Sequence, residues 1–299
     1  MNKAAIKDIS SIVIRLTVTC LLAGIIMGLA FVLTHDAKEK NEQIRDERVM
    51  YSILGFDKKN PAPQTMALHT VYRYILTKGE TQSIAYLVPV AEKYTLVEID
   101  LSGAFVRQVA LDADATKLRN EGERNTAVQS AAGSDYESRF ADQFIVVTDN
   151  GARKAYILDG RYPGFKTFIR VKMALGADYS MLGFEVLEHE EDPGLGAEIE
   201  QEWFRGQFAG KSFDQLKAAH VVRKPMPDDL RAAITTKKPT DADKKLRADH
   251  AGDDIYALTG ATISSRSVLN GNQAMVKKFV YRIELLDKVI RDQGIKVTF

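Results

Sequence analysis

The stretch FIVVTDNGARKAYIL, residues 144–158, decides the fold class because it contains two strand-like runs joined by a short polar turn. The runs FIVV and AYIL are rich in β-branched and aromatic residues, which favour strands. Asn150 and Gly151 between them tolerate the backbone conformations that a tight hairpin turn requires. We therefore predict a β-hairpin, in which the two strands run antiparallel.

Similar strand-like runs lie on both sides of this hairpin, each bounded by turn residues. Two longer segments have helical character, residues 198–213 and a C-terminal segment from about Ser265 to Gln293 with an apolar stripe. Residues 111–142 are predicted as a helical or loop insertion and residues 223–254 as a solvated loop. The fold class is therefore α+β, a twisted antiparallel sheet with packed helices. The flanking strand runs are SIAYLVPV (83–90), YTLVEIDLSG (94–103), TFIRVKMAL (167–175) and MLGFEVLEHE (181–190).

The N-terminus contains a candidate membrane anchor. LTVTCLLAGIIMGLAFVL, residues 16–33, carries no charged side chain, and with the apolar residues from Ile12 it is long enough to cross a hydrocarbon core of about 30 Å. The alternative is a cleaved signal peptide, but THDAKEKNE follows at 34–42 in place of a small-residue cleavage site. We predict an uncleaved single-pass anchor, continued by a helix that leaves the membrane over residues 35–54.

The charges around this anchor predict its orientation. Lys3, Lys7 and Arg15 precede or begin the span, whereas acidic and basic residues are mixed after it. The positive-inside tendency then places the N-terminus in the cytoplasm and the main domain on the periplasmic or external side of the cell inner membrane. The predicted regions are a cytoplasmic N-terminus (1–11), a transmembrane anchor (12–34), an external membrane-proximal α+β region (35–150) and a C-terminal domain (151–299).

Composition excludes several classes of function. The formal net charge of +1 and the absence of a basic block argue against nucleic-acid binding. The five histidines show no metal-ligand spacing, so we expect no metal site. Cys20, the only cysteine, lies inside the predicted anchor and has no partner for an intramolecular disulfide.

The stretch YALTGATISSRS, residues 256–267, is the first candidate site. Gly260 and Ala261 form a turn that a ligand can approach closely. Ser264 or Ser265 can cap the helix that follows, and a helix N-terminus suits a phosphate. Thr262 can be part of a simple cap, or its hydroxyl can be a covalent attachment point for a phosphate group.

The stretch EHEEDPGLG, residues 188–196, is the second candidate. It predicts a tight, backbone-exposed turn after a strand, from which Leu195 is the only large apolar side chain to project. The turn can be a simple strand-to-helix connection. Alternatively, its exposed amides and its leucine can lie against a flat cofactor such as a flavin.

The two stretches together resemble a known family. PGLG followed downstream by TGATISS is similar to the pattern of the FMN-binding domain in the G subunit of the Rnf complex and in the C subunit of the sodium-translocating NADH:quinone oxidoreductase (Nqr). The resemblance extends over roughly residues 155–290 and includes DGRYPG (159–164) and WFRGQFAGKSF (203–213). Both relatives are single-span membrane proteins with an external domain and FMN joined to threonine by a phosphoester.

This resemblance implies a function and a set of residues. The chain would be an electron carrier like the G subunit of Rnf, in an ion-translocating oxidoreductase (translocase) complex, with no catalytic residue and no substrate turnover of its own. The alternatives are the C subunit of Nqr and a non-redox external interaction or assembly module. The implied partners are the other membrane and peripheral subunits and a flavin transferase. The implied FMN-binding residues are Thr262 as the covalent site, Thr259, Gly260, Ala261, Gly194, Leu195, Gly196 and Asp192.

The chain departs from the family pattern in three ways, one of which is that the segments 111–142 and 223–254 make it longer than typical G subunits. Tyr256 stands six positions before Thr262, where the family usually has an acidic residue, and Asp253 and Asp254 lie slightly further back. Asp192 replaces the usual threonine before PGLG. Arg266 and Lys277 are candidates for the counter-charge of the phosphate, or are solvated helix positions.

Overall fold

The computed structural model describes residues 3–236 and 238–299, which form two compact units that meet between Val49 and Met50. Most of the first unit belongs to helix α1 (Lys3–Ile53). Within α1, Ile12–His35 is the one stretch of the described chain that is long and apolar enough to cross a membrane. It coincides with the predicted anchor, and the helix continues beyond it as expected.

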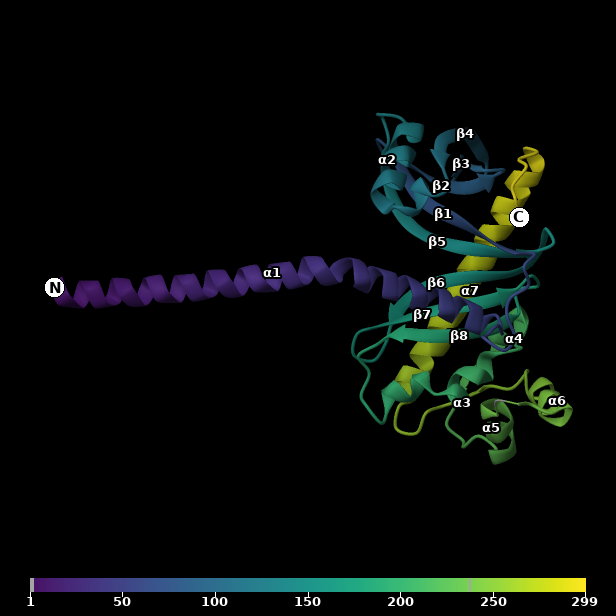
Figure 1. The fold of residues 1–299 in the computed structure, drawn as a ribbon. Coiled ribbons are helices and arrows are strands. Elements are labelled where there is room, and N and C mark those ends of the chain that lie inside the picture. Colours follow the sequence, from purple (N-terminus) through teal and green to yellow (C-terminus); the bar gives the residue numbers. More distant parts are fainter. Residues whose placement is uncertain (1–2, 237) are drawn as a thin grey trace. The chain divides into compact units, whose positions relative to one another are not determined.

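The second unit is built on an eight-stranded sheet, shown in Figure 1, in which every neighbouring pair is antiparallel. The strand order is β4-β3-β2-β1-β5-β6-β7-β8, so two four-stranded meanders join where β1 pairs with β5. The strands are β1 (Met66–Lys78), β2 (Thr81–Val90), β3 (Lys93–Asp100), β4 (Phe105–Asp114), β5 (Glu137–Asp149), β6 (Ala152–Pro163), β7 (Phe168–Gly176) and β8 (Met181–Glu188).

The predicted hairpin at 144–158 is confirmed. Asn150 and Gly151 have φ angles of 51° and 76°, the left-handed values of a tight hairpin turn, and Asp149 pairs with Ala152 on its two sides. Because β5 and β6 are adjacent strands, the sheet is continuous across residue 150.

Two strands of the eight-stranded sheet were not predicted from the sequence. β1, at the centre of the sheet, and β4, at its edge, lie in segments that were not predicted as strands, and the segment 111–142 contains the end of β4 and the start of β5 around helix α2 (Glu121–Ala132). β1 carries Arg73, which is 8% exposed and pairs with Asp142 of β5. This internal ion pair lets a charged residue occupy a central strand, so that the sequence lacks the uniform apolar run of a buried strand.

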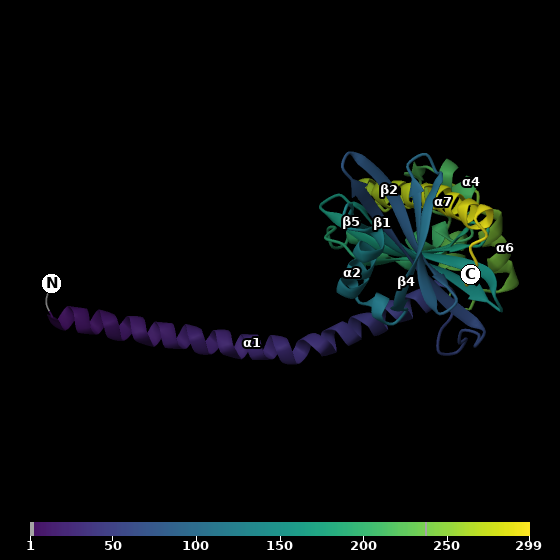
Figure 2. The ribbon, with the colours of Figure 1, turned by 90° about the horizontal axis from the view of Figure 1, so that it is seen from above.

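Helices cover both faces of the sheet, which is strongly twisted in the view of Figure 2. The C-terminal helix α7 (Thr262–Asp292) packs its predicted apolar stripe into the main core cluster with Val71 of β1. The next residue, Tyr72, packs in a second cluster with α2. Because successive side chains of a strand point to opposite faces, α7 and α2 lie on opposite sides of β1.

The segment between β8 and α7 differs from the prediction. Residues 198–213 do not form one helix but a series of short turns, interrupted where Gly210 adopts a φ of 81°. Residues 223–254 are not a bare loop, because they contain two short helices. The elements of this segment are η2 (Gly196–Glu200), α3 (Glu202–Arg205), η3 (Gly206–Phe208), α4 (Phe213–Ala218), β9 (Val221–Val222), α5 (Asp228–Thr235), α6 (Asp241–Asp249) and β10 (Ile255–Tyr256). Elsewhere in the chain, a further short helix, η1 (Lys117–Arg119), precedes α2.

Candidate functional site

The N-terminus of α7 has free backbone donors. The helix begins at Thr262, three residues before the predicted start, and the preceding Ala261 has no side-chain group that could cap it. In the described part of the chain, no partner accepts a hydrogen bond from the backbone N–H of Thr262, Ile263 or Ser264. These groups and the helix dipole give this end a partial positive charge, which suits a phosphate.

The two serines after Thr262 do not act as the predicted caps. The hydroxyl of Ser265 accepts a hydrogen bond from the Leu258 N–H and donates one to the Ala261 carbonyl, each at 3.0 Å. It therefore fixes the turn from Leu258 to Ala261 from inside the first helical turn. The Ser264 hydroxyl donates to the Glu191 carboxylate.

The structure brings the two candidate stretches together. Gly260 has a φ of 75°, and a Cβ atom built on it would lie 2.9 Å from Cδ2 of Leu195. A side chain at position 260 would therefore collide with the leucine. At the residue after Leu195, a Cβ atom on Gly196 would lie 2.7 Å from Oγ of Ser264. Glycine at positions 196 and 260 therefore allows the PGLG loop to pack closely against the turn before α7 and its first helical turn.

The outer part of the PGLG loop is open. Gly194 has a φ of 73°, and nothing lies within 4 Å of the position its Cβ would take. The carbonyl of Asp192 accepts hydrogen bonds from the N–H groups of Leu195 and Ala197, at 3.1 and 3.0 Å, which closes the turn. The Asp192 side chain forms an ion pair with Lys166, so its charge is partly compensated.

A buried carboxylate that the sequence analysis did not assign to the site ties three segments together. Glu191 is 4% exposed. Its Oε1 accepts from the N–H groups of Phe165 and Lys166, at 2.7 and 3.3 Å, and its Oε2 accepts from the Ser264 hydroxyl. A run of acidic residues before PGLG was the only available signal, and it did not distinguish Glu191 from exposed Glu190.

Three exposed apolar side chains belong to the segments that Glu191 connects. Phe165, Leu195 and Ile263 are 54%, 45% and 57% exposed. Large exposed apolar side chains in segments that join at a bare helix N-terminus are the surface that a flat aromatic ring with a phosphate group would cover. The residues present therefore fit FMN by both shape and charge.

The two threonines of the stretch have different positions. Thr259 is exposed and lies in the turn, before Gly260. Thr262 is half-buried and is the first residue of α7, adjacent to the free N–H groups. Of the two counter-charge candidates, Arg266 lies one helical turn after Thr262 on the same face. Lys277 lies about 22 Å from Thr262 along the helix axis, which is too far to contact a phosphate on Thr262.

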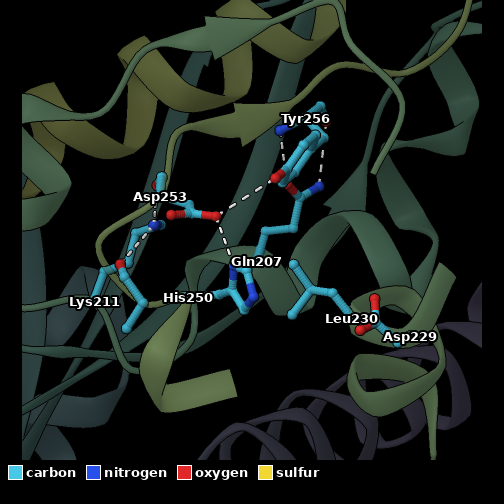
Figure 3. Close-up of polar contacts among 8 residues, drawn as sticks. Gln207, Lys211, Asp229, Leu230, His250, Asp253 and Tyr256 are labelled. Atoms are coloured by element: carbon cyan, nitrogen blue, oxygen red, sulfur yellow. Dashed lines mark hydrogen bonds and ion pairs between the residues drawn. The ribbon is translucent and has the colours of Figure 1, made fainter. Parts of the chain in front are cut away.

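Tyr256, which stands where the family usually has an acidic residue, has a structural environment (Figure 3). It lies in β10, where the Gln207 side chain accepts from its N–H at 2.7 Å and donates to its carbonyl at 3.3 Å. Its hydroxyl lies 3.4 Å from the Asp253 carboxylate, and burial, followed by the charge of Asp253, raises the pKa of Tyr256. Tyr256 thus anchors the strand that leads into the TGAT turn.

Lys211 binds the backbone of the residues that precede the same strand. It is 1% exposed, and its Nζ donates to the carbonyls of Ala251 and Asp253, at 2.7 and 2.5 Å. Burial lowers the pKa of Lys211. The backbone carbonyl of Asp253 is therefore bound by the buried lysine, and the carboxylate of Asp253 lies 2.7 Å from the ring of His250 (Figure 3).

Comparison with known proteins agrees with this geometry. Residues 164–277 match the FMN-binding domain family. The G subunit of the proton-translocating ferredoxin:NAD(+) oxidoreductase complex of Clostridium ljungdahlii is 29% identical over 124 residues, which cover 42% of this chain and 52% of that protein. The G subunit of the ion-translocating oxidoreductase complex of Cereibacter sphaeroides is 34% identical over 127 residues, which cover 42% of this chain and 46% of that protein.

The chain thus spans about half the length of the curated relatives it matches. Among solved structures, NqrC of Shewanella oneidensis aligns with a TM-score of 0.40 and 17% identity, over 77% of this chain and 90% of that chain. The matched segment contains both candidate stretches and the buried Glu191 that joins them. Residues 164–277 therefore match the FMN-binding domain family, and over 124–127 residues the chain is similar to the G subunits of ion-translocating oxidoreductase complexes.

Proposed function

We propose that this chain is an electron carrier of a membrane ion-translocating oxidoreductase complex, similar in role to the G subunit of Rnf, and that FMN is attached to Thr262 through a phosphoester. The observation that supports it most directly is the start of α7, where the backbone N–H groups of residues 262–264 are free, Ile263 is exposed, and exposed Leu195 lies against Gly260 two residues before Thr262. The match of residues 164–277 to the FMN-binding domain family supports the identity of the cofactor.

The chain's own residues would bind and orient the cofactor. The N–H groups of residues 262–264 would hold the phosphate, and Leu195 would lie against the flavin ring. Gly194, Gly196, Gly260, Ala261, Thr259 and Asp192 would shape the surrounding loops. When bound, FMN would supply the ability to accept electrons from one partner and pass them to another.

Attachment requires a balanced exchange at phosphorus. Oγ1 of Thr262 would form the new bond to the flavin phosphate of an activated flavin dinucleotide, and the bond from that phosphorus to the nucleotide leaving group would break. The hydroxyl proton would leave with the nucleotide. A flavin transferase would catalyse this step, and the other membrane and peripheral subunits would supply and remove electrons.

The test compares two threonines. The wild-type chain, produced with the flavin transferase of its own host, should give a fluorescent band after denaturing electrophoresis. Thr262→Ala should abolish the band and leave the fold intact, because Thr262 provides no cap hydrogen bond and alanine is a good helix former. Thr259→Ala is the matched control and should keep the band, whereas Thr262→Ser should label partially.

Mass spectrometry of the peptide that contains Thr262 decides the attachment. A mass increase equal to one FMN phosphoester is the expected result. A wild-type chain from its own host without that increase would overturn the proposal and favour a non-redox interaction module. Tyr256→Asp should raise labelling if the transferase depends on an acidic residue at that position.

A further inference from the structure

A second candidate binding site lies away from the flavin turn. A cavity of about 520 Å³ is lined by residues of α7 and of strands β1, β2, β5, β6 and β7. This volume is within the range of small-molecule sites in proteins. Lys278, which lines it, is about 24 Å along the α7 axis from Thr262, so the cavity does not belong to the candidate FMN site.

The cavity carries an excess of positive charge. Asp142 and Asp159 line it but are already paired, Asp142 with Arg73 and Arg282 and Asp159 with Lys172. Three further basic residues that line it are exposed. Arg170 is paired with Glu188 at 3.1 Å. The other two are Arg161, whose guanidinium lies 4.0 Å above the Phe168 ring, and Lys278. No ion pair compensates these two charges within residues 3–236 and 238–299. They are available to an anion.

The walls of the cavity are apolar. Phe144 and Leu158 of the sheet and Phe279 of α7 are 6%, 5% and 6% exposed, and half-buried Met275 lies beside them. Aromatic and aliphatic side chains of this kind favour a flat, apolar molecule. A hydrated inorganic anion would leave most of this surface unused.

A buried hydroxyl has no partner in this cavity. Tyr86 lines the cavity and is 1% exposed, and its hydroxyl has no hydrogen-bond partner in the part of the chain that the structure describes. Burial raises the pKa of Tyr86 to about 12, so the hydroxyl keeps its proton at neutral pH. Buried polar groups without a partner are rare in folded proteins, and a ligand with a hydrogen-bond acceptor would satisfy this one.

We propose that this cavity binds a small organic anion with a flat apolar body and a carbonyl-type acceptor. The acidic group lies between Lys278 and Arg161. The body packs over Phe144 and Phe279, whose rings contact each other edge to face with centroids 5.2 Å apart, and the acceptor receives the hydrogen bond of Tyr86. This site is independent of flavin attachment, because none of its residues belongs to the two loops that surround Thr262.

The probe for this proposal is 9-fluorenone-2-carboxylate, titrated by calorimetry into the 299-residue chain purified from its own host in detergent. The expected result is one saturable site after subtraction of the detergent background. Lys278→Glu should weaken binding at least tenfold. Lys277→Glu makes the same charge change at the neighbouring exposed position, which does not line the cavity, and should change affinity by less than twofold.

The hydroxyl is tested with a matched pair of probes. Tyr86→Phe should weaken binding of 9-fluorenone-2-carboxylate about tenfold but leave binding of fluorene-2-carboxylate, which lacks the carbonyl, within twofold. Absence of saturable binding to the wild type would overturn the proposal. Equal losses from the two lysine variants, or equal effects of Tyr86→Phe on both probes, would also overturn it. None of these readouts depends on whether Thr262 carries FMN.

Discussion

At the scale of single residues, Glu191 holds the candidate site together. Glu191→Ala would leave the N–H groups of Phe165 and Lys166 and the hydroxyl of Ser264 without their common acceptor. Unpaired buried donors typically cost about 1–3 kcal/mol, so we expect the free energy of unfolding to fall by that amount. Chemical denaturation in detergent measures it, and flavin labelling should fall in parallel.

Two controls separate this effect from a general loss of charge. Glu190→Ala removes an exposed neighbouring carboxylate and should leave stability within about 0.5 kcal/mol of the wild type. Glu191→Gln should recover part of the loss, because its amide oxygen still accepts from Phe165 and its amide group can donate to Ser264. Equal stability of the Glu191→Ala and Glu190→Ala variants would contradict the role we assign to Glu191.

Leu195 is expected to act on the flavin and not on the fold. It is 45% exposed, and its contact with Gly260 lies at the surface. Leu195→Ala should therefore keep the covalent label and the melting temperature but shift the flavin absorbance and midpoint potential, because the ring loses an apolar neighbour. Potentiometric titration measures the shift. An unchanged spectrum and potential would argue against a ring position over the PGLG loop.

Local motifs in the candidate site were predictable and long-range contacts were not. The small side chains of the TGAT turn and the glycines of PGLG are properties of consecutive residues, so both are visible in the sequence. Glu191 acquires its role only by meeting Phe165 and Ser264, which are 26 and 73 positions away in the chain. A single sequence does not encode such pairings in any local pattern.

At the scale of elements, the contact of α7 with β6 depends on a glycine in mid-helix. A Cβ atom on Gly271 would collide with the ring of Tyr162, which is buried and donates to Asn272 at 3.2 Å. Gly271→Ala should gain helix propensity of about 1 kcal/mol, but overpacking costs about 1–3 kcal/mol. We therefore expect a net decrease in melting temperature, measured by differential scanning fluorimetry.

Asn270→Ala is the matched control for this helix. Residue 270 is exposed on α7, so the substitution gains helix propensity without a collision. It should keep or slightly raise the melting temperature. A Gly271→Ala variant as stable as the Asn270→Ala variant would show that the Tyr162 contact tolerates an added methyl group.

Strong periodic elements were predicted, and elements with buried charge were not. The β5–β6 hairpin and the stripe of α7 follow from side-chain period and turn chemistry, and both are present. β1 was missed because Arg73 and His69 interrupt its apolar pattern. Their partners, Asp142 and Thr148, come from β5, so only the assembled sheet explains why these polar residues fit in a central strand.

At the scale of the whole molecule, the function depends on the side of the membrane on which residues 50–299 lie. We predict a cytoplasmic N-terminus, because Lys3, Lys7 and Arg15 precede or begin the apolar segment Ile12–His35. A periplasm-active reporter fused after residue 60 should then be active in a Gram-negative host. A cytoplasm-active reporter at the same point is the control and should be inactive.

The charges themselves can be tested, since the prediction depends on them and not on the length of the span. Replacing Lys3 and Lys7 with glutamate removes the basic residues before the span and should lower the activity of the periplasmic reporter while raising that of the cytoplasmic one. An inactive periplasmic reporter on a stable wild-type fusion would place the FMN-binding domain in the cytoplasm. Flavin attachment to Thr262 could still occur there, but the external electron carrier that we propose could not, so this measurement separates the location of the domain from its chemistry.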